Sequence, residues 1–185
     1  MTRLSRSLAK RTYDALHAAF LEDIPDILGQ EGFVRSPFPS HHFGEDGPDR
    51  TYEFANLETT TTLEFLEFHL LKEDLFIRVY FNAVTLDAPV TDLGIFNASS
   101  GNALVNPPVT LTRDSLHRWL PVPFLKIPLN YAVKPGKIKT EADIETVIAK
   151  PVTDLGNDLR YLDIIRAEWL EKHTPCTVSL DALVA

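Results

Sequence analysis

Cysteine is nearly missing from the sequence: Cys176 is the only one among 185 residues. A single cysteine excludes an intramolecular disulfide and a zinc site built from several thiolates. Chains without disulfides are typical of reducing compartments, so the sequence favours a cytoplasmic protein. Cys176 follows His173 by three residues but comes after Pro175 near the chain end, and we interpret it as an incidental thiol.

Long hydrophobic runs are also missing. No apolar run approaches the roughly 18 residues of a membrane span, and the start MTRLSRSLAKRTYDAL has no continuous apolar segment of the secretory kind. Its arginines and serines imitate an organelle transit peptide, but the segment continues directly into a helical pattern. We therefore expect a soluble, cytoplasmic protein without a membrane partner.

The glycine patterns of phosphate-binding loops do not occur, and neither does the G-x-S-x-G turn of serine hydrolases. The nearest approach to that turn, residues 98–101 (ASSG), lacks the first glycine. The sequence therefore contains no recognisable catalytic motif and implies no cofactor, and it leaves open whether the protein is an enzyme.

Basic residues are fewer than acidic ones: the sequence has 18 Lys and Arg, 26 Asp and Glu, and a formal net charge of -8. Such a surface repels phosphate backbones and anionic lipids, so we expect no nucleic-acid partner, whereas a basic protein partner would be attracted. The hydrophobic content of 44% is that of a globular protein, and no break in composition divides the chain. We expect one domain over residues 1–185.

Helical and extended segments alternate in the first third of the chain. Apolar residues recur at helical spacing over residues 8–28, and Gly29 or Gly32 offers a left-handed cap after them. Residues 33–43 are extended, but their prolines restrict them to the edge of a sheet. Residues 50–57 (RTYEFANL) predict a further strand.

The strongest signal is a β-hairpin over residues 63–84 (LEFLEFHLLKEDLFIRVYFNAV). A turn centred on Glu73 and Asp74 makes the numbers of paired residues sum to 147. This register gathers the apolar residues on one face, whereas a shift by one residue would mix the faces, and burial selects against such slips.

The second half of the chain combines a proline-rich stretch with helices. Residues 86–138 predict extended pieces and turns that cross the sheet, with a short helix at residues 114–120. A helix should begin at Thr140 and end near Pro151, and another should span about residues 153–172. The sequence thus predicts an α+β fold: an N-terminal helix, an antiparallel β-meander with a central hairpin, a proline-rich crossing segment and C-terminal helices.

One face of the predicted hairpin carries polar chemistry. The register places Glu67 opposite Tyr80 and His69 opposite Arg78, with Asn82 on the same face. Glu67 could orient His69, and the two-pronged guanidinium of Arg78 could hold a small anionic ligand. These five residues are our candidate ligand-binding set, although plain cross-strand charge pairing would also explain them.

The segment SHHFGEDGPD, residues 40–49, brings His41 and His42 close to three carboxylates. Consecutive side chains of an extended segment point to opposite faces, so at most one of the two histidines could join a metal site. The acids also lack the spacing of a calcium loop. We interpret the segment as a surface turn and expect no metal.

Two hypotheses about function follow. The first is a non-enzymatic binding or protein-interaction module, such as an acidic inhibitor or immunity-like protein, because the charge is negative and catalytic motifs are missing. The alternative is a small-molecule enzyme or sensor with its pocket on the polar face of the hairpin. The sequence does not reveal the oligomeric state.

Overall fold

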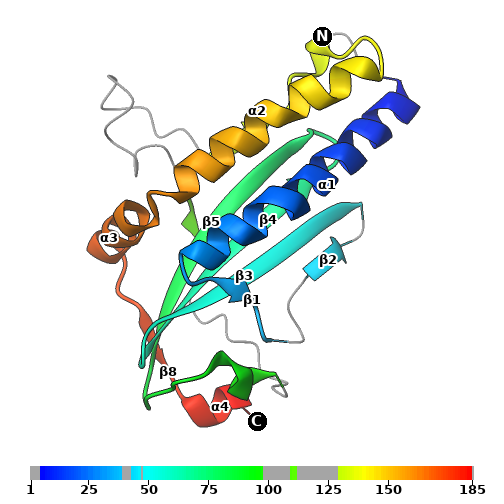
Figure 1. Cartoon of the computed structure of the whole chain (residues 1–185). Coiled ribbons are helices and arrows are strands. Elements are labelled where there is room, and N and C mark those ends of the chain that lie inside the picture. The colour runs from blue at the N-terminus through cyan, green and yellow to red at the C-terminus, as the bar shows by residue number, and fades with distance from the viewer. Residues whose placement is uncertain (1–4, 39–42, 47, 98–108, 112–128, 185) are drawn as a thin grey trace.

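The computed structural model describes residues 5–38, 43–46, 48–97, 109–111 and 129–184. Within these ranges, helices pack on an antiparallel sheet (Figure 1), which confirms the predicted α+β class. The elements, in chain order, are α1 (Arg6–Gln30), β1 (Val34–Arg35), β2 (Phe43–Asp46), β3 (Asp49–Thr59), β4 (Thr62–Leu71), β5 (Phe76–Leu86), the 3-10 turn η1 (Leu93–Phe96), β6 (Val109–Thr110), β7 (Asn130–Ala132), the 3-10 turn η2 (Pro135–Lys137), α2 (Ala142–Leu159), α3 (Leu162–Lys172), β8 (Cys176–Val178) and α4 (Leu180–Val184).

Three long strands form the centre of the sheet, in the order β3, β4, β5. The short strands β1 and β2 share the outer edge of β3, and β6, β7 and β8 share the outer edge of β5. All of these pairs are antiparallel except β8, which runs parallel to β5. Two of these edge strands, β6 and β7, fall in the proline-rich region, where the sequence predicted extended pieces.

The hairpin of β4 and β5 has the predicted register. Leu66 pairs with Phe81, Phe68 with Val79, and Leu70 with Ile77, so the numbers of each pair sum to 147. The turn between the strands includes Leu75 at a φ of 53°, a left-handed conformation that is uncommon for a branched side chain.

Helix α1 lies across the sheet and ends where the sequence allows it. Most of its buried side chains recur three or four residues apart, and the apolar ones share a core cluster with residues of the strands. Gly32 has a φ of 85° and its N–H donates to the Gly29 carbonyl, while the Phe33 N–H donates to the Leu28 carbonyl at 2.9 Å. This pair of bonds is a Schellman cap, so of the two glycines considered, Gly32 provides the left-handed residue.

The main core lies between the sheet and the helices. It consists of the helix-facing residues of the three long strands, the buried stripes of α1, α2 and α3, and residues of the β6–β7 region. A second, smaller apolar cluster lies on the opposite face of the sheet and includes Phe96 of η1, Val178 of β8 and Leu183 of α4. The rest of that opposite face carries the polar residues described below.

The expected end of a helix near Pro151 is wrong, because α2 continues through Pro151 to Leu159. A proline inside a helix costs about 3 kcal/mol through its missing N–H and its ring. Ile148, Val152 and Leu155 are buried on one stripe across this point, and burial of each such side chain contributes about 1.5–3 kcal/mol. The free energy gained by burying this stripe exceeds the cost of the proline. The break comes instead at Tyr161, between α2 and α3.

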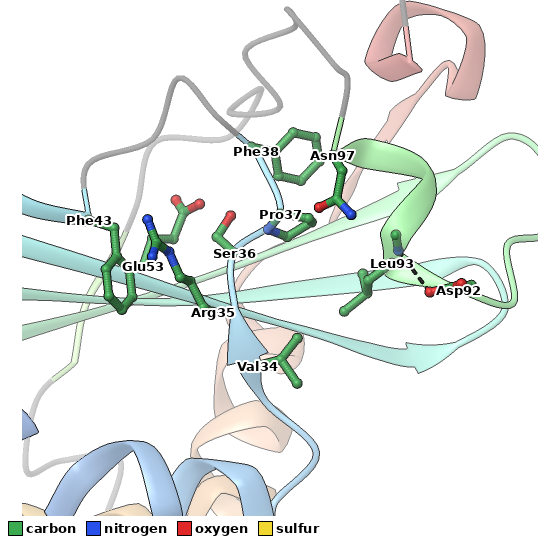
Figure 2. Close-up of a pocket in the computed structure, with 11 residues that line it drawn as sticks. Val34, Arg35, Ser36, Pro37, Phe38, Phe43, Glu53, Asp92, Leu93 and Asn97 are labelled. Atoms are coloured by element: carbon green, nitrogen blue, oxygen red, sulfur yellow. Dashed lines mark hydrogen bonds between the residues drawn. The ribbon is translucent and has the colours of Figure 1, made fainter. Parts of the chain in front are cut away.

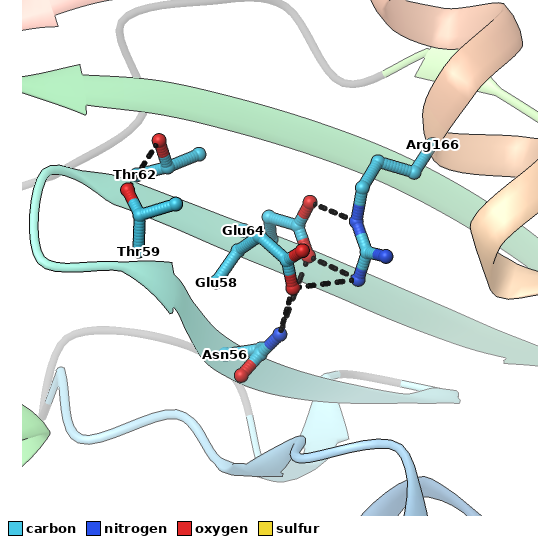
Figure 3. Close-up of polar contacts among 6 residues, drawn as sticks. All are labelled: Asn56, Glu58, Thr59, Thr62, Glu64 and Arg166. Atoms are coloured by element: carbon cyan, nitrogen blue, oxygen red, sulfur yellow. Dashed lines mark hydrogen bonds and ion pairs between the residues drawn. The ribbon is translucent and has the colours of Figure 1, made fainter.

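Helix α3 is tied to the sheet by a buried ion pair (Figure 3). The Arg166 Nε donates to Glu64 Oε1 at 2.6 Å and Nη2 donates to Glu64 Oε2 at 3.0 Å. Glu64 is 1% exposed and also accepts a hydrogen bond from Asn56. Glu58 forms a second, more exposed ion pair with Arg166 at 3.1 Å.

No helix in the described part of the chain is long and apolar enough to cross a membrane. Some expectations fall on residues that the structure does not describe: the short helix at residues 114–120, the pair His41 and His42, the stretch 98–101, and the crossing segment over 98–108 and 112–128.

Candidate functional site

The five candidate residues of the hairpin lie on one face of the sheet. Glu67 pairs with Tyr80, His69 pairs with Arg78, and Asn82 pairs with Phe65. Because side chains alternate between faces, these residues lie opposite the face that packs on the helices. The placement on one face agrees with the sequence analysis; their role in binding stays a prediction.

Four of the five side chains form a continuous series of contacts. Glu67 Oε1 and His69 Nε2 form a hydrogen bond, and the rings of His69 and Tyr80 meet edge to face with centroids 4.9 Å apart. Arg78 Nη1 donates to the Tyr80 hydroxyl at 3.3 Å, and its guanidinium lies 5.2 Å from the centroid of the Phe76 ring. The contacts fix the orientation of His69 and Arg78 on rigid strands.

Asn82, the fifth residue, has different surroundings. It is 1% exposed, and its Oδ1 accepts a hydrogen bond from the backbone N–H of Ala83 at 2.9 Å. Its partner in the register, Phe65, belongs to the second apolar cluster. Asn82 therefore lies at the boundary between the polar and apolar halves of this face.

Glu53 is the residue that the sequence analysis missed. The pairing of β3 with β4 places it directly opposite Glu67, on the same polar face, and only 2% of it is exposed. Burial raises the pKa of Glu53 from its ordinary value of 4.5 to about 7; the Ser36 hydroxyl acts against this rise, and the charge of Glu67 adds to it. The sequence did contain a signal for this position: the alternation of polar and apolar residues in RTYEFANL. Extending the hairpin register to this third strand would have placed Glu53 opposite Glu67.

The edge of the sheet is interrupted beside Glu53. Strand β1 pairs with Phe54 and Ala55, and β2 pairs with residues 49–52, so Glu53 lies between the two paired stretches of β3. The Ser36 N–H donates to the Glu53 carbonyl at 3.0 Å and holds the backbone of β3 at this gap.

A cavity of about 450 Å³ opens at this interruption (Figure 2). Among the described residues, the charged side chains that line it are Arg35, Glu53 and Asp92. The Arg35 guanidinium lies 4.0 Å from the centroid of the Phe43 ring, while Asp92 Oδ1 accepts a hydrogen bond from the Gly94 N–H at 2.8 Å and so caps η1. The other described residues of the lining are Val34, Ser36, Pro37, Phe38, Phe43, Leu93, Gly94 and Asn97.

The arrangement can hold or release one proton near neutral pH. When Glu53 loses its proton, two negative charges stand opposite each other on neighbouring strands, which is unfavourable. A cation that enters the cavity would offset this repulsion and favour the ionised form. Within the described residues, no group of three or more His, Cys, Asp or Glu side chains converges.

Comparison of the chain with known protein families, curated proteins and solved structures finds no match.

Proposed function

We propose that this protein is a non-enzymatic binding module that holds a cationic group, an amine or a guanidinium, in the cavity beside Glu53. The observation that carries the proposal is the position of Glu53: a buried carboxyl on the wall of a cavity, opposite a second carboxylate, Glu67. A cation bound in the cavity would interact favourably with the ionised carboxyl, and more strongly there than in bulk water.

The size and charge of the molecule support this function. A cavity of about 450 Å³ lies within the range of about 300–1,000 Å³ that is usual for small-ligand sites. The formal net charge of -8 raises the local concentration of cations and speeds their encounter with the protein.

Binding should be coupled to loss of the Glu53 proton. With a pKa of about 7, a large share of Glu53 is protonated at neutral pH in the free protein. A cation binds the ionised form more tightly, so its affinity should increase as the pH rises from 6 to 8. Up to about one proton should be released per ligand at pH 6, about half a proton at pH 7 and almost none well above pH 8.

The cationic group can belong to a small molecule or to a lysine or arginine of a basic protein partner. Isothermal titration calorimetry separates these sources, with agmatine and putrescine as one pair of probes and a lysine-rich peptide as the other. Titration in two buffers of different ionisation enthalpy measures the protons released. The expected result is millimolar binding or tighter of at least one class, with proton release.

The matched variants are Glu53→Gln and Glu73→Gln. Glu53→Gln removes the charge but keeps the shape, and it should weaken binding about 10-fold to 100-fold, since a hydrogen bond to a charged group contributes about 1.5–3 kcal/mol. Glu73 is exposed in the turn between β4 and β5, so its variant should bind like the natural protein. Equal binding by Glu53→Gln, or no binding of either probe class, would remove this function.

The small anionic ligand expected at Arg78 stays a separate prediction. Acetate and inorganic phosphate test it in the same calorimeter, and Arg78→Gln should abolish their binding while leaving cation binding intact.

A further inference from the structure

A groove runs along the seam between α1 and α2, on the outer side of the helical layer. The two helices lie side by side and run in the same direction (Figure 1). Arg11 forms an ion pair with Glu141 at one end, and Gly156 touches α1 at the other end, where a Cβ would lie only 2.8 Å from Ile27 Cδ1. Two hollows of about 620 and 310 Å³ follow this seam and share part of their lining, Glu22 and Val152 included, so they form one continuous groove.

The floor of the groove is apolar and its walls are low. Ile144, Ile148 and Val152 form the bottom, while Ala18 and Ala149 are exposed at the sides. Small side chains keep the seam open, and a row of small residues between two helices lets the ridge of a third helix settle into it.

The rim of the groove is acidic along its middle. Glu22, Asp23, Asp26 and Glu145 line it, all exposed. Within the described part of the chain, two cations line the groove, Arg11 and Arg160; they stand at its opposite ends, and Arg11 is already paired with Glu141. The central part of the groove therefore presents negative charge beside an apolar floor.

We propose that the groove between α1 and α2 binds a basic amphipathic helix of a partner protein. An apolar stripe on that helix would lie on the isoleucine and valine floor, and flanking lysines or arginines would meet the acidic rim. The span of α1 from Arg11 to Ile27 corresponds to about 24 Å, which fits a helix of roughly 16 residues. A second copy of this chain is a poor occupant, because each copy carries a formal net charge of -8.

This surface is independent of the cavity at Glu53. The groove lies on the helical side of the sheet, and Glu53 faces the opposite side. Failure of one site therefore leaves the other intact, and Glu53→Gln should bind the helix like the natural protein.

Fluorescence anisotropy with a labelled 16-residue peptide tests the proposal. The probe carries leucines at helical i, i+3 and i+4 spacing and lysines elsewhere, and its control replaces every lysine by glutamate. The lysine peptide should bind and should weaken as salt rises, and the glutamate peptide should not bind.

Paired variants separate the groove from general attraction to an acidic protein. Ala18→Trp fills the groove and should weaken binding at least tenfold, whereas Ala167→Trp, at an exposed alanine of α3, should have no effect. The double change Glu22→Lys and Asp23→Lys should weaken binding at least tenfold and flatten its salt dependence. Glu73→Lys with Glu171→Lys makes the same change in net charge at exposed positions outside the groove.

Circular dichroism of each variant shows that the fold is retained. Equal weakening by both charge pairs, or unchanged binding by Ala18→Trp, would overturn the proposal. A dimer of the free protein that Ala18→Trp dissociates would assign the groove to a second copy and overturn the proposed partner.

Discussion

Two buried carboxylates on opposite faces of the same sheet have different surroundings. Glu64 on β4 is 1% exposed, and Arg166 holds both of its oxygens (Figure 3). Glu53 on β3 is 2% exposed, but it faces the carboxylate of Glu67 and a cavity (Figure 2). Burial alone thus does not determine the role of an acid. Glu64 and Arg166 form a structural clamp between β4 and α3, whereas the like charge of Glu67 adds to the rise in the pKa of Glu53.

The largest effect is expected when Arg166 is removed from its ion pair with Glu64. Arg166→Met would leave Glu64 buried without its guanidinium partner, and removal of one member of a buried ion pair costs about 3–5 kcal/mol. We expect a fall of this size in the free energy of unfolding, measured by urea denaturation at pH 7. Glu64→Gln combined with Arg166→Met should be less destabilised than Arg166→Met alone, and equal losses would argue against a charged clamp.

The next effect concerns Glu53 and pH. Its folded-state pKa of about 7 lies above the unfolded value of 4.5, so its contribution to stability is full below pH 4.5 and is lost as the pH rises through 7. A difference of about 2.5 pKa units corresponds to about 3 kcal/mol. Between pH 5 and pH 8, the natural protein should therefore lose up to about 3 kcal/mol relative to Glu53→Gln.

Urea denaturation at several pH values measures this difference. The two proteins should have similar free energies of unfolding near pH 5 and diverge toward pH 8, with Glu53→Gln the more stable. Glu73→Gln, at an exposed position, should follow the natural protein throughout. Parallel curves for Glu53→Gln and the natural protein would contradict the raised pKa.

A smaller effect is expected when the negative charge of Glu67 is removed. Glu67→Gln removes the negative charge opposite Glu53, so the pKa of Glu53 should fall and the ionised protein should become more stable. Directly opposed like charges on neighbouring strands destabilise by about 1 kcal/mol or less. We expect a gain of that size at pH 8 and almost none at pH 5, where Glu53 is protonated; a gain that is equal at both pH values would point to a different cause.

The smallest effect is expected at Glu58, the second carboxylate that pairs with Arg166. Glu58 also pairs with Arg166, but its side chain is 38% exposed. Glu58→Gln should therefore change the free energy of unfolding by about 0.5 kcal/mol or less, because solvent screens an exposed pair. A loss as large as that of Arg166→Met would show that exposure does not separate the two pairs.

The sequence predicted the polar face of the hairpin because both of its determinants are local. The polar turn at Glu73 and Asp74 joins two strands of clear alternation, and only one register separates the apolar from the polar side chains. The same reasoning placed Glu67, His69, Arg78 and Tyr80 on one face.

The cavity at Glu53 could not be predicted in the same way, because it depends on long-range pairing. Its gap arises where β1 and β2 both pair with β3, and its far wall comes from Asp92 and Asn97. Likewise, the continuation of α2 past Pro151 depends on burial against other elements, which local propensity does not encode.

A pH titration of the Glu53 side-chain carboxyl by ¹³C NMR, assigned by its loss in Glu53→Gln, is the most direct measurement. The expected midpoint lies near pH 7 in the free protein and moves to lower pH when agmatine fills the cavity. A midpoint near pH 4.5, unmoved by agmatine, would contradict the assignment of Glu53 as a buried, proton-exchanging group on a binding cavity.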